Sequence, residues 1–288
     1  MTTNTRDPTH NLEAAMTPEQ AWQMILRQCH QPDTASDRWP SEAPLSDDDH
    51  ARQLLQLFQP LVSPGAPAGN RRVSVVAQMG QSLDGRIATV TGKSRYINGQ
   101  DGLVHLHRLR AVSDAVLVGS GTANADNPRL TVRLAPGPNP VRVVVDRNRR
   151  VPDSHYLFTD DAAPTLRLVA RDNQSPPPPA GIRSGVQEIP CLSGGEGPID
   201  PKEVLSILEG LGLHRIFVEG GGQTVSTFLT AGLVDRLHVL VAPMIIGSGQ
   251  PAFSLPEIDS LTDALRPQAR MVNLGSDMLF DLAFDAHH

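Results

Sequence analysis

The sequence predicts an α/β domain built on a mostly parallel sheet, and two observations lead to this prediction. Short apolar runs rich in valine recur along the chain, at residues 73–79, 115–119, 141–145, 166–170, 215–218 and 236–242. Helix-like stretches separate several of them, at about 99–112, 201–211 and 224–231. Buried strands that alternate with helices are typical of a sheet with both faces covered, which favours parallel pairing.

The end of the chain departs from this alternation. The stretch MVNLGSDMLFDLAF contains two short apolar runs joined at Gly275-Ser276-Asp277. Two strands joined by a short glycine-containing turn form an antiparallel hairpin. We therefore expect a mixed sheet with a C-terminal antiparallel hairpin at one edge.

The first 70 residues have a different character. We expect a helix from Pro18 to Cys29, because proline suits the first turn of a helix. A second helix is expected after Ser46, whose hydroxyl can cap it, and the stretch SPGAPAGN at 63–70 is typical of a linker. Residues 1–70 are thus predicted to be a helical extension and linker, followed by the α/β domain over 71–288.

Composition excludes several classes of protein. The formal net charge of −6 argues against a protein that binds nucleic acid through its phosphates. The chain has only two cysteines, and we find neither a secretory leader nor an apolar run long enough to cross a membrane. We expect a cytoplasmic protein without nucleic-acid or membrane partners.

Zinc and serine hydrolase sites are also not indicated. No histidine is followed by glutamate two residues later, and Cys29 and Cys191 are far apart. The H-x-E and P-C-x-x-C pattern of zinc deaminases is therefore missing, as are H-E-x-x-H, G-x-S-x-G and P-loop motifs. We expect no metal site.

A glycine-rich turn follows the apolar run at 215–218. Glu219 stands at its entrance, Gly220, Gly221 and Gly222 form it, and Gln223 or Thr224 is expected to help cap the next helix. A strand end, flexible glycines and a helix start can together hold a phosphate, although a plain tight turn has the same residues. The dinucleotide fingerprint G-x-G-x-x-G is not matched, because Val225 stands where its last glycine would be.

Small polar residues also follow two other predicted strands. Gly80 and Gln81 follow the first strand, and Gly119, Thr122 and Asp126 follow the second. In open α/β sheets the carboxyl ends of the strands meet at one edge, where ligands bind.

Three arginines are candidates for an anion site. Arg110 near the end of a predicted helix could simply complement the helix dipole. Arg129 and Arg133 lie four residues apart; we expect Arg129 to be solvated, whereas for Arg133 a solvated side chain and an anion contact stay equally open.

Six stretches stand in one order along the chain: SLDGRIA, GKSRYI, HRLRAVSDAVLVGSGTANADNPRLTVR, VRVVVD, VEGGGQT and LVDRLHVLVAPMIIG. With them, the chain from Arg72 onward resembles the reductase domain of riboflavin biosynthesis, the C-terminal half of RibD-type deaminase–reductases. The resemblance implies a dihydrofolate-reductase-like fold, a homodimer and NADPH as cofactor. It also implies reduction of the ribosyl group of a ribosylaminopyrimidine 5′-phosphate to ribityl.

The resemblance assigns roles to individual positions. Those expected to face the cofactor are Gly80, Gln81, Tyr96, Gly119, Thr122, Asp126, Gly220, Gly221, Gly222, Gln223 and Thr224. Those expected to face the substrate are Ser94, Arg110, Leu130 and Arg133, with the two arginines on the 5′-phosphate, for which a guanidinium is well suited. Glu219 is expected near the sugar carbon that is reduced, as an acid or an orienting group.

Three positions depart from the family pattern. Gln78 replaces a common lysine near the substrate, Tyr96 replaces a common tryptophan, and Arg147 replaces a small serine. Arg147 could bind the 2′-phosphate of NADPH or point into solvent. The departures leave two alternatives open, a paralogous reductase for another pterin- or pyrimidine-like substrate and a catalytically silent ligand-binding dimer.

Overall fold

A computed structural model describes residues 16–30, 49–63, 73–95, 97–172, 179, 181–193 and 199–284. The chain forms two compact units, Met1–Ser63 and Pro64–His288. The predicted cap Ser46 lies outside the described residues.

The N-terminal unit is a pair of helices. They are α1 (Pro18–His30) and α2 (Asp49–Val62). α1 begins with a reciprocal cap, because the Thr17 amide donates to Gln20 and the Gln20 amide donates to the Thr17 hydroxyl. The rings of Trp22 and Phe58 meet edge to face with centroids 5.2 Å apart, which joins the two helices.

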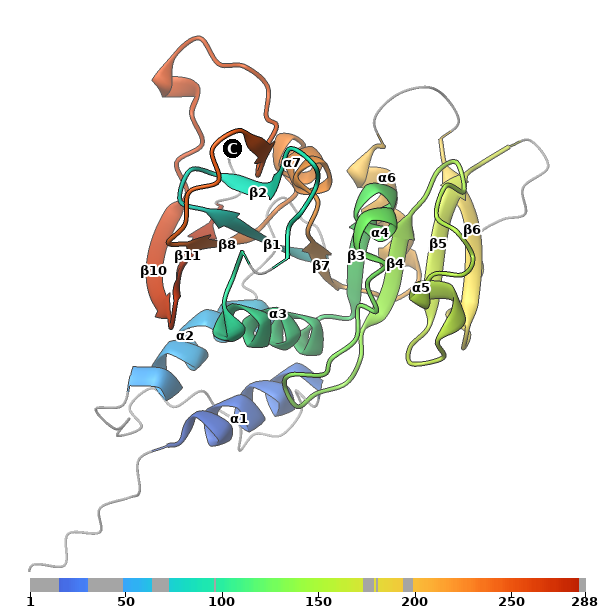
Figure 1. The fold of residues 1–288 in the computed structure, drawn as a ribbon. Helices are drawn as coiled ribbons and strands as arrows, with labels where there is room; N and C mark the ends of the chain where they lie inside the picture. The colour runs from blue at the N-terminus through green and yellow to red at the C-terminus, as the bar shows by residue number, and fades with distance from the viewer. Residues whose placement is uncertain are drawn as a thin grey trace, which may run out of the picture. The chain divides into compact units, whose positions relative to one another are not determined.

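The larger unit contains a nine-stranded sheet in the order β10-β11-β8-β1-β7-β3-β4-β5-β6. Its strands are β1 (Ser74–Ser82), β3 (Ala115–Gly119), β4 (Val141–Val145), β5 (Thr165–Ala170), β6 (Val186–Leu192), β7 (Arg215–Glu219), β8 (Arg236–Ala242), β10 (Gln268–Leu274) and β11 (Asp277–Ala283). All pairs from β8 to β6 are parallel, whereas β11 pairs antiparallel with both β8 and β10. Figure 1 shows the β10–β11 hairpin at one end of the sheet and β5–β6 at the other.

Five helices and a small ribbon complete this unit. The helices are α3 (Gln100–Val112), α4 (Ser120–Asp126), α5 (Tyr156–Thr159), α6 (Pro201–Gly210) and α7 (Gly222–Thr230). The ribbon pairs β2 (Arg86–Thr89) with β9 (Gly249–Pro251), and a 3-10 turn, η2, spans Leu261–Asp263.

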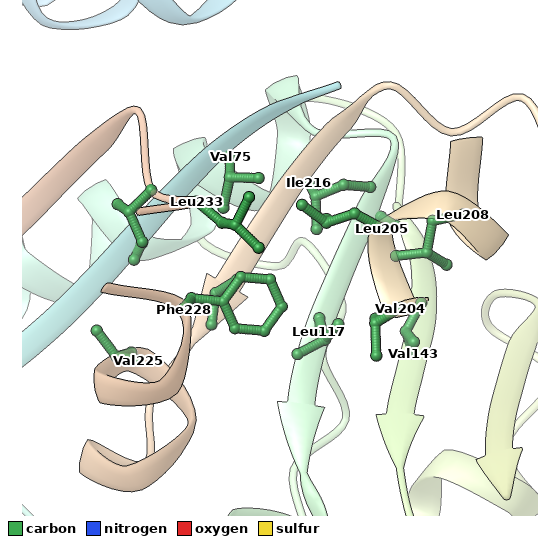
Figure 2. Close-up of a cluster of buried hydrophobic side chains, with 14 of the residues drawn as sticks. Val75, Leu117, Val143, Val204, Leu205, Leu208, Ile216, Val225, Phe228 and Leu233 are labelled. Atoms are coloured by element: carbon green, nitrogen blue, oxygen red, sulfur yellow. The ribbon is translucent and has the colours of Figure 1, made fainter. Parts of the chain in front are cut away.

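The two faces of the sheet differ in chemistry. Successive side chains of a strand point to opposite faces, so Val75, Ala77 and Met79 share one face of β1. This face is apolar and packs against α6 and α7, with Phe228 among strand residues such as Leu117 (Figure 2). The opposite face, toward α3, carries polar side chains, which are Gln78, Glu219 and His238.

The predicted fold class is confirmed: the sheet is mostly parallel and mixed, and the C-terminal hairpin is present. All six predicted Val-rich runs form strands. The elements that were not anticipated are β6, the β2–β9 ribbon and the short helical elements α4, α5 and η2. The carboxyl ends of β1, β3, β4 and β7 lie at the same edge of the sheet, and Gly80, Gly119 and Glu219 lie at or near these strand ends.

Candidate active site

A cradle of glycines and threonines forms where the ends of β3 and β7 meet. A Cβ atom added to Gly119 would lie 2.5 Å from the Thr224 hydroxyl, and one added to Gly221 would collide with the Thr122 hydroxyl. Gly220 and Gly221 have φ values of +57° and +72°, a region that side-chain-bearing residues rarely adopt. The structure therefore brings together predicted cofactor residues from two segments that are 100 residues apart.

The first turn of α7 corrects one prediction. The helix begins at Gly222 after Gly221, and within the described residues no side chain caps it. Gln223 and Thr224 lie inside the first turn, so their predicted capping role is wrong. The first backbone N–H groups of α7 therefore have no side-chain cap, which suits an anionic ligand.

The end of β1 contacts the segment that leads into α3. A Cβ on Gly80 would collide with the Asn98 side chain, and the Asn98 amide donates to the Leu240 carbonyl at 3.4 Å. Gly80 therefore permits a close internal contact as well as lying at the predicted edge. Two other predicted site residues, Gln81 and Ser94, are half-buried. Tyr96 lies outside the described residues.

Glu219 is paired with Arg110. The Arg110 Nη2 and Nε atoms donate to the two Glu219 carboxylate oxygens at 2.6 and 2.8 Å, and Nη1 donates to the Thr131 carbonyl at 2.8 Å. The side chains of Arg110 and Glu219 are only 5% and 14% exposed. Arg110, which was predicted to contact the substrate phosphate, is thus committed to orienting Glu219.

Arg133 is the more accessible of the two predicted phosphate ligands. Its residue is exposed, its amide donates to His107 Nδ1 at 2.9 Å, and its Nη1 donates to the Thr131 hydroxyl at 2.6 Å. Desolvation lowers the pKa of Arg133, and the nearby cations Arg110 and Arg129 lower it further. The acids Glu219 and Asp160 oppose this shift. Arg110 and Arg129 are paired with these acids, so the exposed guanidinium of Arg133 is the one best suited to an anion.

Leu130 precedes this segment in a strained conformation. Its φ is +52° and its side chain is fully buried. The backbone turn at Leu130 presents the Thr131 carbonyl to Arg110, while the leucine side chain anchors the segment. Leu130 was predicted to face the substrate; the structure places its side chain in the interior.

A second carboxylate lies near Glu219. Partial desolvation raises the pKa of Asp126, the negative charge of Glu219 raises it further, and Arg95 opposes both. Asp126 ends α4 with much of its surface exposed. Arg95 was not singled out from the sequence, because a lone arginine in a loop carries no pattern of its own.

Gln78 forms the polar floor beside Glu219. The two residues are register neighbours on β1 and β7, and His238 is the register neighbour of Gln78 on β8. Gln78 is 7% exposed, and its Oε1 atom has no hydrogen-bond partner among the described residues. Buried carbonyl groups are rarely left unsatisfied, so this atom is a candidate acceptor for a ligand.

Arg147 follows β4 at the same edge. Its neighbour Asp146 is buried and accepts from Arg167 and from the amides of Arg150 and Val151. The Asp146 carboxylate therefore has a structural role in the turn after β4. Arg147 itself is half-buried, which argues against a purely solvated side chain.

In the described ranges, no helix is both long and apolar enough to cross a membrane. No group of three histidine, cysteine or acidic side chains in those ranges could hold a metal ion. The fold and the site together define an α/β domain with a glycine-rich, polar edge at the carboxyl ends of its parallel strands.

The chain belongs to the RibD C-terminal domain family, whose model matches residues 73–280. It is 39% identical over 217 residues to the 2,5-diamino-6-ribosylamino-4(3H)-pyrimidinone 5′-phosphate reductase of Methanothermobacter thermautotrophicus, covering 73% of this chain and 97% of that protein. It is 32% identical to the riboflavin biosynthesis protein RibD of Aquifex aeolicus, covering 81% of this chain but 62% of that longer protein. These relatives make the chain an oxidoreductase.

Solved structures agree with the fold. The crystal structure of a diaminohydroxyphosphoribosylaminopyrimidine deaminase/5-amino-6-(5-phosphoribosylamino)uracil reductase from Thermotoga maritima matches with a TM-score of 0.60 at 26% identity. The match covers 82% of this chain and 61% of that chain. The Saccharomyces reductase Rib7 matches with a TM-score of 0.61 at 22% identity, which shows the shared fold.

Proposed function

We propose that the chain is an NADPH-dependent reductase of riboflavin biosynthesis, which converts the ribosyl group of a ribosylaminopyrimidine 5′-phosphate to ribityl. One observation carries the proposal: a glycine cradle, a buried carboxylate and an arginine cluster converge on the same edge of the sheet. The activity named for the Methanothermobacter relative, which this chain matches over 97% of its length, supports the same substrate class.

The cradle fits a dinucleotide. The lack of a Cβ at Gly119 and Gly221 lets the Thr224 and Thr122 hydroxyls lie close to the backbone, and no side chain caps the first turn of α7, whose N–H groups suit a pyrophosphate. Half-buried Arg147 at the end of β4 is a candidate for the 2′-phosphate that distinguishes NADPH from NADH. When bound, NADPH supplies the hydride for reduction of the sugar carbonyl or imine.

The chain's own residues would bind and orient the sugar phosphate. The exposed guanidinium of Arg133 is suited to the 5′-phosphate, and the Glu219 carboxylate, held by Arg110, can accept a hydrogen bond from a sugar hydroxyl. The pKa of Asp126 is raised, which favours a carboxyl group that can hold a proton on its oxygen next to Glu219. We therefore assign Glu219 an orienting role.

The test measures the rate of NADPH oxidation at a fixed protein concentration. The amino- and the oxo-pyrimidine ribosyl phosphates are supplied as separate substrates. We expect turnover of one of them, and a rise of about tenfold or more in KM for Arg133→Leu, because the phosphate contact is lost. Absence of turnover with both substrates, with intact NADPH binding, would reject the proposal.

A second candidate function is favoured by Gln78. A neutral amide stands where a lysine is common in the family, and its free Oε1 accepts a hydrogen bond where an ammonium group would donate one. A paralogous reductase for another pterin- or pyrimidine-like substrate would fit this exchange. Activity that is missing from the wild type but appears in Gln78→Lys would favour this second function.

We also propose that the protein acts as a cytoplasmic homodimer. The segment between β9 and β10 projects from the sheet (Figure 1) and exposes four large apolar side chains, which are Leu255, Ile258, Leu261 and Leu265. Exposed apolar side chains that gather on one segment are typical of an interaction surface. Sedimentation equilibrium tests the dimer: a monomer at micromolar concentration would contradict it.

A further inference from the structure

One face of α3 holds the segment that presents Arg133. His107 and Arg110 lie three residues apart on the helix and therefore point to the same side. His107 Nδ1 accepts the Arg133 amide at 2.9 Å, and Arg110 Nη1 donates to the Thr131 carbonyl at 2.8 Å. Two side chains of one helix thus fix two successive parts of the 131–133 backbone.

The contact of His107 is specific in its chemistry. The His107 side chain is 3% exposed, and its hydrogen bond with the Arg133 amide is part-buried, so loss of this acceptor removes the partner of that amide. To accept at Nδ1 the ring must carry its hydrogen on Nε2. Burial and the cations Arg110 and Arg133 lower the pKa of His107 to about 4, which keeps the imidazole able to accept at neutral pH.

The Thr131 residue joins this contact to the Glu219 pair. Its carbonyl accepts from Arg110, and its hydroxyl accepts from Arg133 Nη1 at 2.6 Å. Arg110 in turn holds both oxygens of Glu219. The same face of α3 therefore holds both the 131–133 segment, which carries Arg133, and the Glu219 carboxylate at the end of β7.

We infer that His107 is a positioning residue, which fixes the arm that presents Arg133 to the phosphate of the substrate. The inference rests on the proposed function in so far as Arg133 binds that phosphate. Without the acceptor, the part-buried Arg133 amide loses its partner and the 131–133 segment is free to loosen. Ordering it again on binding would weaken phosphate affinity without touching the cofactor cradle.

Two variants of His107 separate hydrogen bonding from packing. His107→Leu removes the acceptor and keeps an apolar side chain of moderate size, whereas the Oδ1 atom of His107→Asn can accept near the position of Nδ1. The matched control is His105→Leu. His105 lies on the same helix, is 2% exposed, and contacts His238 instead of the 131–133 segment.

The probes are ribose 5-phosphate, ribose and NADPH, titrated separately by calorimetry against each variant. For His107→Leu we expect affinity for ribose 5-phosphate to fall about tenfold, the loss of roughly one buried hydrogen bond, with NADPH affinity unchanged. His107→Asn should recover to within about threefold of wild type, and His105→Leu should bind both as wild type does. Hydrogen exchange at the Arg133 amide should accelerate in His107→Leu alone.

The inference is overturned if His107→Leu binds ribose 5-phosphate as wild type does, if His107→Asn gives no recovery, or if His105→Leu is equally impaired. Failure of the wild type to bind ribose 5-phosphate would also overturn it. Failure of the proposed function has a different signature, which is intact ribose 5-phosphate binding with no reduction of either pyrimidine substrate.

Discussion

Arg110 and Glu219 are joined by two hydrogen bonds, of 2.8 and 2.6 Å, across 109 positions of sequence. The fork of the guanidinium matches the two carboxylate oxygens, and both side chains are largely removed from water. A third hydrogen bond from Arg110 reaches the Thr131 carbonyl. The pair fixes the residue at which β7 enters the glycine turn, so it connects the 131–133 segment with that turn.

Removing one partner of this pair should cost more than removing an exposed arginine. In Arg110→Leu the Glu219 charge stays buried without its counter-ion, and we expect the free energy of unfolding to fall by about 3–5 kcal/mol. Arg129→Leu is the control: Arg129 is 48% exposed and lies 3.7 Å from Asp160, so its loss should cost no more than about 1 kcal/mol. Urea denaturation measures both, and equal losses would contradict the interpretation of the pair.

Much of the sheet could be predicted because its strands are apolar enough to be recognised one at a time. The β3 and β4 strands, AVLVG and VRVVV, are rich in valine, and Gly275 marks the hairpin. β6 was not predicted because it contains Pro190, and a proline normally argues against a strand. The sheet order explains its tolerance, since β6 is an edge strand. The strands β2 and β9 are too short to show a pattern.

The site could be predicted only in part, for a physical reason. Glycines and threonines after strands indicate where a ligand approaches backbone, and the structure does bring Gly119 and Thr122 to the β7–α7 turn. His107 and Thr131 were not predicted as part of the site because their contacts involve backbone groups, namely the Arg133 amide and the Thr131 carbonyl. The positions of these groups depend on the φ of +52° at Leu130. No pattern of residue types encodes that turn. Arg95 acts through proximity to Asp126, which only the folded chain creates.

The glycine cradle should respond to single methyl groups in an order set by the space at each position. Gly221→Ala combines a φ of +72° with a collision against Thr122, so we expect at least a tenfold loss of NADPH affinity and destabilisation of about 1–3 kcal/mol. Gly119→Ala meets only the Thr224 hydroxyl and should be milder. Gly121→Ala meets no atom within 4 Å and should bind NADPH normally. Fluorescence quenching by NADPH measures the series, and a harmful Gly121→Ala would contradict it.

Gln78 should show opposite effects on stability and activity. Gln78→Leu removes a buried carbonyl that lacks a partner among the described residues, so the free energy of unfolding should stay level or rise by up to about 1 kcal/mol. If Oε1 accepts from the substrate, turnover should fall about tenfold or more in the same variant. Gln100→Leu, at the exposed start of α3, is the control for a change in amide content. A Gln78→Leu protein that is both less stable and fully active would rule out a ligand role.

Acid should destabilise the protein through buried histidines behind the site. Burial lowers the pKa of His105 well below its usual value and lowers that of His238, whose Nδ1 lies 2.9 Å from His105 Nε2. Desolvation opposes the shift at Asp281, but contacts from His238 and Arg236 hold the pKa of that carboxyl well below its usual range.

Both kinds of shift act in the same direction. Between the lowered histidine pKa values and 6.5 the unfolded chain binds more protons than the folded one, so stability is complete above pH 6.5 and declines as the pH falls. The Asp281 contribution is complete above about pH 3.8 and is lost as the pH falls from there toward the lowered pKa of this carboxyl. We therefore expect the melting temperature to fall by roughly 5 °C or more from pH 7 to pH 5.

A double variant identifies the histidines as the source of this decline. His105→Leu with His238→Leu removes both titrating groups, so its melting temperature should change much less between pH 7 and pH 5 than that of the wild type. His214→Ala, at an exposed position, should keep the full wild-type slope. Circular dichroism melts at several pH values measure all three proteins. An unchanged slope in the double variant would show that the acid sensitivity arises elsewhere, with His107 as the next group to test, because its pKa of about 4 gives it the same sign.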